Sequence, residues 1–560
     1  MVLVLLSWLL WTILFWPLGK AVCYATVGKQ ENGLSIAEVL MLGMALVAFE
    51  GIVYSCFAPL DFTFKALVTT QSVACFLLYD LRREIQISRP KRADWPWYLV
   101  LSVFAFGLMM KAAAPIGSFD AGLYYRPTIN WLSEYGLVPG LGNLHGRLAF
   151  NSAWHTLVAG VQLPLGNGVY LEDLNEYLVL IFLVFAAENL RMAKKVAFEW
   201  MLLLIGIPLF LVQFLSAPAP DLPVYVCSLF IFMRLLKVLK AEDINHASIL
   251  FLLWIGAFLL FIKLSSLSIC LLLLGLILQV GTKLRVQTWA LTLLPLLLVG
   301  AAWVFRFYTM TGYLAYPLPS AAVNIGRPDW TIPTELVKAE VQDVEGFAKV
   351  PMSVVAPTKM PMAERAAQPM RSWIRYWAEA RTWKEYVFFL IYGISLVLVL
   401  AKLARMVSKG SNRWLALGTL LYIFGSLGLW FLKAPDPRFF IGQLVGVPIL
   451  AIGVLRLQIR TKAGVAVAVM AALWFCLLAL DVRSVREYAL VPAGYGPTLV
   501  KTLRINNLEV LVPLPTVEGG WETRCYDAPI PCTFEEKTDL ERLEMRGTSL
   551  KDGFRTKQDN

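Results

Sequence analysis

The chain has 560 residues, of which 58% are apolar and only 16% are charged. Soluble domains carry about 25% charged residues, so this composition excludes an ordinary soluble protein and favours an integral membrane protein. The net charge of +11 does not require a nucleic-acid partner, because surplus lysine and arginine in membrane proteins collect in cytoplasmic loops.

A series of apolar segments approaches the roughly 20 residues that a helix needs to cross a bilayer. A buried soluble core would explain one such segment, but not a series along the whole chain. The first segment lacks a basic start and a clear small-residue cleavage site, so we interpret it as a span. We expect about fourteen transmembrane helices in an all-α polytopic fold, near residues 3–18, 35–57, 63–80, 97–114, 169–190, 197–215, 223–239, 247–262, 264–281, 286–304, 385–402, 414–432, 437–455 and 463–481.

Short basic loops indicate the orientation of these spans. Such loops follow the third, fifth, ninth, eleventh and thirteenth spans, at residues 80–94, 191–195, 282–287, 402–413 and 456–462. If the spans alternate in direction, all five loops lie on the same side, which should be the cytoplasm. We therefore expect a multi-pass membrane protein whose opposite face lies toward the periplasm or the cell exterior.

The opposite, periplasmic face then collects the unusual segments. It receives an outer loop at 115–168, a second long loop at 305–384, and a tail at 482–560. The predicted organisation is a transmembrane domain over 1–481, which includes both outer loops, followed by a small periplasmic cap.

Within the outer segments, local patterns predict short elements. In the second loop, Met370, Trp373, Ile374 and Trp377 recur at helical spacing, which is typical of an amphipathic helix on a membrane surface. In the first loop, "YRPTINWLSEYG" predicts a short helix that ends near Gly136. In the tail, the run "NLEVLVPL" predicts a small hairpin.

Two cysteines lie in the tail rather than in a span. Cys525 and Cys532 occur in "RCYDAPIPC", where six residues separate them and two prolines stiffen the turn. Because the outer compartment is oxidising, we expect a disulfide between them.

Asp120 is the first candidate for chemistry, because it follows a span directly among apolar neighbours. A carboxylate in that position can act as a base, a metal ligand or a positioning acceptor. Asp120 could equally cap a helix that begins near Gly122. The same two interpretations apply to Asp221 in "APAPDLPVY", at the outer start of the seventh span.

Two cations near the outer face are candidates for an anionic ligand. Lys263 lies between two apolar segments, where it could extend its ammonium toward water or bind an anionic head group. Arg438 in "KAPDPRFF" could hold a phosphate with two parallel hydrogen bonds. His145 and His155 lack metal-ligand spacing, and no HExxH, CxxC pair or Walker sequence occurs.

Several segments together resemble a bacterial multi-span family found among surface-polysaccharide genes, which is similar to the GT-C glycosyltransferase superfamily. These segments are "FDAGLYYRPTINWLSEYGLVPGLGNLHGRLAFNSAWHT", "SAPAPDLP", "FIKLSS", "TGYLAYPLP", "APDPRFF" and "CYDAPIPCTF". The resemblance implies a GT-C-like helical fold, a sugar donor carried on polyprenyl phosphate, an acidic residue in an outer loop, and basic residues that hold the donor phosphate.

On this resemblance, Asp120 is the expected catalytic residue, and Lys263 and Arg438 are expected to bind the donor phosphate. No metal ligand is assigned, and a divalent metal is left open as a cofactor. The remaining residues are expected to contact substrate: Tyr124, Arg126, Asn143, His145, Arg147, Asn151, His155, Asp221 and Asp436.

We therefore expect a multi-pass glycosyltransferase of the bacterial inner membrane, with its active face in the periplasm. It moves a sugar from a polyprenyl-phosphate-linked donor to a glycan, lipid or protein acceptor. Its partners are membrane lipid, donor and acceptor, and no nucleic acid. An O-antigen polymerase or ligase is the first alternative, because the second outer loop carries Arg365, Arg371, Arg375 and Arg381. A flippase or transporter of lipid-linked glycan is the second, although spans such as 286–304 lack the polar residues that it needs.

Overall fold

The computed structural model places most of the chain. It describes residues 1–29, 33–84, 94–166, 168–191, 195–207, 212–241, 244–281, 286–322, 327–355, 360–410, 412–495, 498–514, 524–534 and 540–557. Several residues of the predicted basic loops lie outside these ranges, namely 85–93, 192–194, 282–285 and 411.

The described chain is mostly helical, and a helix overlaps each of the fourteen predicted segments. Among the described residues, eight helices are long and apolar enough to cross a membrane: α1 (Val2–Thr26), α2 (Ile36–Tyr54), α4 (Trp95–Ala113), α10 (Asp221–Ala241), α13 (Val286–Thr311), α18 (Trp383–Lys409), α19 (Arg413–Lys433) and α21 (Thr461–Ala479). Four shorter apolar helices are α3 (Phe62–Leu78), α11 (His246–Ile262), α12 (Ile269–Val280) and α20 (Ile441–Leu455). These twelve helices, together with α8 (Leu174–Arg191) and α9 (Phe198–Gly206), are the helices that overlap the fourteen predicted segments. The fold is thus a polytopic helical one, while the number of crossings stays a prediction.

Local sequence explains where some of these helices begin. Ser35 and Glu38 form a capping box at the start of α2, and Thr382 and Glu385 form another at the start of α18. Each box satisfies backbone N–H groups that the first turn leaves without a partner. Gly410 ends α18 in the left-handed conformation (φ 74°), which glycine adopts without strain.

The outward faces of several long helices are apolar. Large apolar side chains that are more than half exposed include Leu294, Leu297 and Leu298 on α13, Leu390 and Val397 on α18, and Leu477 on α21. Soluble proteins rarely expose a continuous surface of this kind. The exposed apolar side chains therefore support a lipid-facing surface.

Inside the bundle, small residues allow close helix contacts. A Cβ atom built on Gly275 of α12 would lie 2.7 Å from the Cα of Gly418 on α19. A larger side chain at either position would force the two backbones apart. Helices in membranes commonly use small residues in this way, because dispersion contacts replace the hydrophobic effect there.

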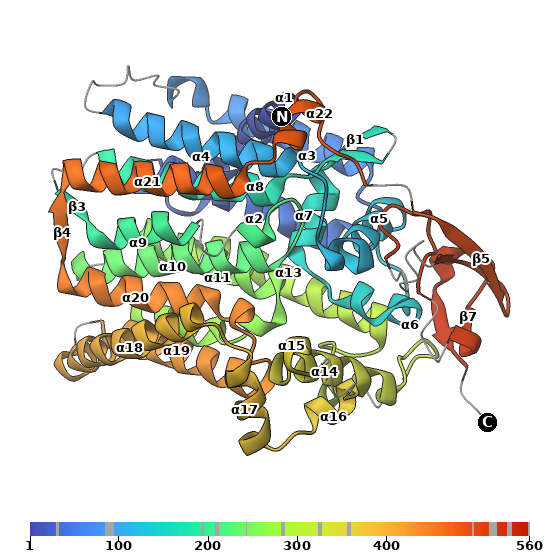
Figure 1. Cartoon of the computed structure of the whole chain (residues 1–560). Helices are drawn as coiled ribbons and strands as arrows, with labels where there is room; N and C mark the ends of the chain where they lie inside the picture. The colour runs from blue at the N-terminus through green and yellow to red at the C-terminus, as the bar shows by residue number, and fades with distance from the viewer. Residues whose placement is uncertain are drawn as a thin grey trace.

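The two ends of the bundle differ (Figure 1). At one end, β3 (Lys195–Ala197) pairs antiparallel with β4 (Gln458–Arg460). This pairing joins the loops after the fifth and thirteenth predicted spans. The backbone N–H of Trp414 at the start of α19 donates to Oε1 of Gln279 at the end of α12 at 3.0 Å. This bond places the helix ends beside the loops 282–287 and 402–413 next to each other. These pairs agree with the prediction that the basic loops share one side.

The opposite end, which we call the tail end, carries the first outer loop and the C-terminal tail. The first loop forms the π-helical turn η3 (Ala121–Tyr125), α5 (Arg126–Glu134), α6 (Leu141–Leu144), the 3₁₀ turn η4 (Gly146–Ala149), α7 (Ala153–Val161), and the strands β1 (Leu163–Gly166) and β2 (Val169–Leu171). The predicted short helix is therefore confirmed as α5. Gly136 follows it with φ 72°.

The second outer loop forms α14 (Thr334–Lys349), α15 (Met352–Val355), α16 (Met362–Ala366) and α17 (Met370–Glu379). The predicted amphipathic helix is α17. Trp373 is buried against Phe431, and Trp377 packs against Trp430. Met370 and Ile374 stay exposed on the same helix.

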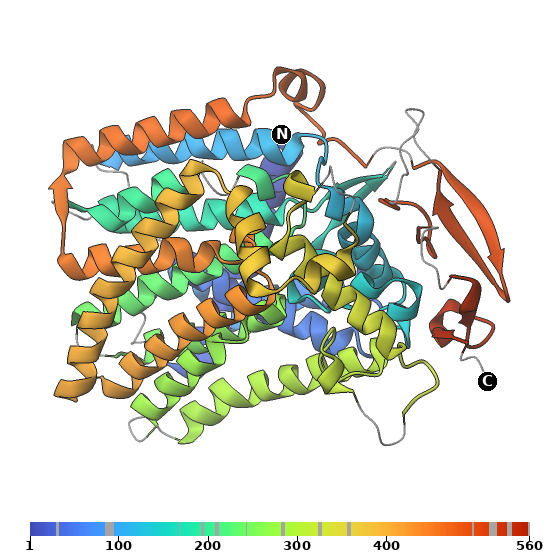
Figure 2. The same cartoon turned by 60° about the horizontal axis from the view of Figure 1, so that its bottom comes forward.

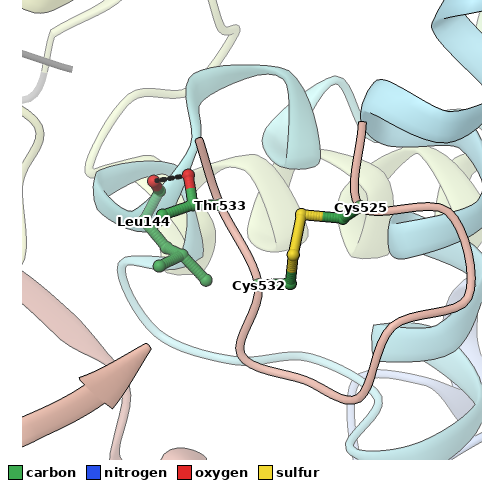
Figure 3. Close-up of a disulfide and its surroundings, with 4 residues drawn as sticks. All are labelled: Leu144, Cys525, Cys532 and Thr533. Carbon is green, nitrogen blue, oxygen red and sulfur yellow. Dashed lines mark hydrogen bonds between the residues drawn. A yellow bond between two sulfur atoms is a disulfide. The ribbon is translucent and has the colours of Figure 1, made fainter. Parts of the chain in front are cut away.

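The tail forms α22 (Val482–Glu487), the hairpin β5 (Val500–Ile505) with β6 (Leu508–Pro513), and the pair β7 (Leu543–Met545) with β8 (Phe554–Thr556). Figure 2 shows these strands beyond the end of the helical bundle. The predicted hairpin is confirmed, and so is the disulfide between Cys525 and Cys532, whose Cα atoms lie 6.0 Å apart. Beside it, Thr533 donates to the Leu144 carbonyl at 3.2 Å and attaches the disulfide loop to α6 (Figure 3).

Candidate functional site

Asp120 lies at the tail end, between α4 and η3. Its backbone is already helical, and its side chain makes no capping hydrogen bond. The interpretation of Asp120 as a helix cap is therefore wrong. Its carboxylate faces two cations instead, with Oδ1 3.9 Å from Nη1 of Arg147 and Oδ2 4.0 Å from Nη1 of Arg438. Both separations exceed hydrogen-bond length, so the carboxylate is held between two charges without being bound tightly to either.

Arg147 comes from η4 and is held mainly by a residue of α14. Its Nε donates to Glu340 Oε1 at 3.1 Å, and its guanidinium lies 5.8 Å from the ring centre of Tyr124. Gly146 permits this approach, because a Cβ there would be 2.6 Å from the Tyr316 hydroxyl and 3.1 Å from Glu340 Oε2. The second outer loop thus contributes directly to the surroundings of Asp120.

Arg438 lies in the 3₁₀ turn η9 (Pro437–Phe439), where Asp436 accepts from the Arg438 backbone N–H at 2.9 Å. The Arg438 guanidinium lies 4.6 Å from the ring centre of Phe439 and 5.5 Å from that of Phe347 on α14. Its buried Nε has no hydrogen-bond partner among the described residues. Arg438 therefore retains capacity to bind an anion.

Lys263 reaches the same place from the end of α11. It forms an ion pair with Asp221, the first residue of α10, and its Nζ lies 4.3 Å from the ring centre of Phe439. One aromatic ring therefore contacts both cations that were predicted to bind phosphate. We name the assembled group the Asp120 cluster; it consists of Asp120, Arg147, Asp221, Lys263, Glu340 and Arg438.

Burial and the charges of the Asp120 cluster shift the pKa values of Tyr124 and Arg147. Burial raises the pKa of the Tyr124 hydroxyl, and the nearby Asp120 carboxylate raises it further. Burial alone would lower the pKa of Arg147, but Glu340, Tyr124 and Asp120 outweigh it, so the pKa is raised. Tyr124 is therefore a neutral hydroxyl, and Arg147 is a permanent cation.

The cluster does not resemble a metal site. No group of three or more His, Cys, Asp or Glu side chains in the described part of the chain is arranged to hold a metal ion. Arg147 and Arg438 flank the Asp120 carboxylate and would repel a divalent cation. The residues around Asp120 do not fit the divalent metal that the sequence left open.

Two predicted substrate contacts have a different role. Arg126, whose exposed fraction is 1%, donates to Gln162 at 2.6 Å, to Glu172 at 2.9 Å and to Asp527 of the tail at 3.0 Å. Asn143 donates to the Trp330 carbonyl and accepts from Thr556 of β8 at 2.9 Å. Both side chains attach the tail to the first outer loop.

The contacts of the two predicted site histidines are with other residues. His145 packs against Phe534 of the tail, and its Nδ1 accepts from the Arg147 backbone N–H at 3.2 Å. His155 is buried beside Tyr125, and burial lowers its pKa to about 3, although a hydrogen bond with the Pro218 backbone partly offsets this. His155 is therefore neutral near pH 7.

Asn151 has φ 51° and connects α13 to the first outer loop. It donates to the Trp303 carbonyl at 2.8 Å and accepts from Arg306 at 2.7 Å.

Of the predicted site residues, the fold thus brings Asp120, Arg147, Asp221, Lys263 and Arg438 together, with Tyr124 and Asp436 beside them. The other five predicted residues make the structural contacts described above; they are Arg126, Asn143, His145, Asn151 and His155.

The sequence interpretation missed α14. Glu340 binds Arg147, and Phe347 lies against Arg438 two turns later on the same face. Helical spacing in "ELVKAEVQDVEGFAK" could have identified an amphipathic helix. Nothing in that spacing indicates which distant residues its polar face meets.

The chain belongs to a family described as a domain of unknown function, DUF8201, whose model matches residues 1–445. No curated protein and no solved structure matches the chain. Every residue of the Asp120 cluster lies within the matched range, whereas the tail lies beyond it.

Proposed function

We propose that this member of the DUF8201 family is a membrane glycosyltransferase that uses a polyprenyl-phosphate-linked sugar. The observation that carries the proposal is the Asp120 carboxylate, 3.9 Å from Arg147 and 4.0 Å from Arg438 at one end of an apolar helical bundle. Lys263 adds a third cation beside Arg438. A carboxylate next to converging cations suits a hydroxyl acceptor and a phosphate leaving group.

In this mechanism Asp120 takes the proton of the acceptor hydroxyl as its oxygen attacks the anomeric carbon of the donor sugar. The bond between the anomeric carbon and the phosphate oxygen breaks, and the electron pair leaves with polyprenyl phosphate. Arg438 and Lys263 stabilise the charge that develops on that phosphate. Arg438 is available because its contact with Asp120 is loose, whereas Lys263 has to exchange Asp221 for the phosphate.

Membrane placement is part of the same proposal. All fourteen apolar helices cross the bacterial inner membrane, and the tail end faces the periplasm. At the other end, the pairing of β3 with β4 and the bond between Trp414 and Gln279 bring the basic loops to one side, which supports this orientation.

A thiol-labelling experiment tests the orientation. The six free cysteines are first replaced by alanine, and a single cysteine is placed at exposed Lys551 in the tail or at exposed Ser408 on α18. A membrane-impermeant reagent should label Lys551→Cys in intact spheroplasts and should label Ser408→Cys only after lysis. The reverse pattern would contradict the proposed orientation.

Three of the four arginines that suggested a polymerase or ligase form contacts with nearby residues. Arg365 is buried and donates to the Met360 carbonyl, Arg375 pairs with Glu379, and Arg381 pairs with Glu385. None of these contacts involves the Asp120 cluster, so the geometry favours the transferase over this alternative.

Asp120→Asn tests the catalytic role. It removes the charge but keeps the size, and no capping bond is lost. We expect product formation to fall roughly 10²-fold or more at unchanged protein level. The measurement is glycan and glycoconjugate analysis in a deletion strain complemented with each variant.

Asp61→Asn is the matched control. Asp61 accepts from the Thr63 backbone N–H at 2.8 Å and caps α3, a role that asparagine fills about as well. Normal product from Asp120→Asn at matched protein level would end the claim that Asp120 is the base.

A further inference from the structure

A second polar site lies beneath the first outer loop, separate from the Asp120 cluster. It is a small cavity between α5, η4 and α13. Its apolar wall includes Leu148 and Met310, and its polar wall includes Thr128, Trp131 and Arg306. The proposed glycosyl transfer makes no use of this cavity.

Arg306 is an unusual residue for such a place. It belongs to α13, and its exposed fraction is 2%. Its Nε donates to Asn151 Oδ1 at 2.7 Å, and its Nη1 donates to the Ser55 hydroxyl. Both partners are neutral, and no carboxylate in the described part of the chain forms an ion pair with Arg306. A buried guanidinium is costly unless an anion compensates its charge.

Two further polar groups in the cavity wall lack partners. Trp131 Nε1 and Thr128 Oγ1 are buried, and neither has a hydrogen-bond partner among the described residues. The exposed fractions of these residues are 1% and 7%. An indole N–H and a guanidinium can only donate. Because these three side chains line one small cavity, an acceptor that carries negative charge suits it best.

We propose that this cavity binds a single monatomic anion of the size and charge of chloride. One negative charge balances Arg306, and the spherical ion accepts from the guanidinium, the Trp131 N–H and the Thr128 hydroxyl together. A divalent oxyanion would leave an uncompensated charge against the apolar wall. The bound ion joins α13 to α5, and so stabilises the packing of the first outer loop on the bundle.

The test uses the full-length protein purified in detergent, with thermal unfolding followed as sodium gluconate is replaced by sodium chloride at constant ionic strength. We expect chloride to raise the unfolding temperature with a saturating dependence, and bromide to do the same. In the double variant Thr128→Val with Trp131→Phe, the midpoint concentration should rise about tenfold or more, because two donors to the ion are lost.

Trp254→Phe is the matched control, since Trp254 is equally buried and its Nε1 also lacks a partner in the described residues, but it does not line the cavity. It should respond to chloride like the original protein. If the double variant does not fold, Thr128→Val alone replaces it. The proposal is overturned if chloride has no effect beyond gluconate, if sulfate stabilises equally, or if the variants keep the original midpoint.

Discussion

The Nε of Arg126 donates to Oδ1 of Asp527 at 3.0 Å, although 401 positions separate these residues in the chain. The guanidinium also binds Glu172 at 2.9 Å and lies 3.4 Å from the ring centre of Tyr170. Asp527 belongs to the loop closed by the disulfide, which is thereby attached to the helical segment that follows Asp120. A single buried arginine thus connects the tail to the region of the candidate site.

Loss of this connection should destabilise the protein in graded steps. Arg126→Met leaves the Glu172 and Asp527 carboxylates without their cation, which should cost about 3–5 kcal/mol. Asp527→Asn keeps an acceptor for Arg126 and should cost about 1 kcal/mol. Thermal unfolding and the rate of tail release by a protease measure both effects. Equal stability of the two variants would contradict the anchoring role.

The disulfide should contribute to stability more than to chemistry. Cys525 and Cys532 close a short loop, so replacing both with serine should cost about 2 kcal/mol. In the native protein neither thiol should react with an alkylating reagent until a reductant is added. Activity per folded molecule should stay close to that of the original. Free alkylation without reductant would show that the bridge is absent.

Lys263→Met should distinguish phosphate binding from simple pairing with Asp221. The change removes the charge but keeps an apolar side chain over Phe439, so use of the lipid-linked donor should weaken by about tenfold or more. It should also destabilise the protein by about 3 kcal/mol, because buried Asp221 loses its cation.

Adding Asp221→Asn to that variant removes the unpaired carboxylate and should restore stability. Donor use, measured as KM in membranes, should stay impaired. If the double change restores both stability and activity, Lys263 is only the counter-ion of Asp221.

His155 should make stability depend on pH in a defined direction. Its pKa in the folded protein is about 3, below the ordinary value of 6.5. Well above pH 6.5 the imidazole is neutral in both the folded and the unfolded states, so its burial does not reduce the stability of the folded protein. As pH falls below 6.5 the unfolded chain binds a proton that the folded protein does not, and stability falls by up to about 1.4 kcal/mol per pH unit.

Between pH 7 and pH 5 this amounts to about 2 kcal/mol. His155→Gln cannot titrate, so its unfolding temperature should fall less over the same range. Comparing the two proteins at each pH removes the contribution that their shared carboxylates make to the pH dependence. Parallel curves would contradict the burial of a neutral His155.

The sequence by itself determined the elements that depend on local composition. Long apolar runs specify helices wherever they occur, and the periodicity around Trp373 and Trp377 specifies α17, because side-chain direction within a helix repeats with the chain. The hairpin and the disulfide were also predictable, since Cys525 and Cys532 are too close in the chain to be held far apart. Asp120, Lys263 and Arg438 could be chosen as candidates from their residue type and their position at the ends of apolar segments.

Only the tertiary structure decided which polar residues meet. Asp120 and Arg126 lie only six positions apart in sequence, yet Asp120 faces Arg147 and Arg438 while Arg126 is enclosed by Glu172 and Asp527. The direction of each side chain at the end of η3 depends on how α14, η9 and the tail pack around it. Glu340 was missed for the same reason, because its partner lies in another loop and no local pattern encodes a contact between distant segments.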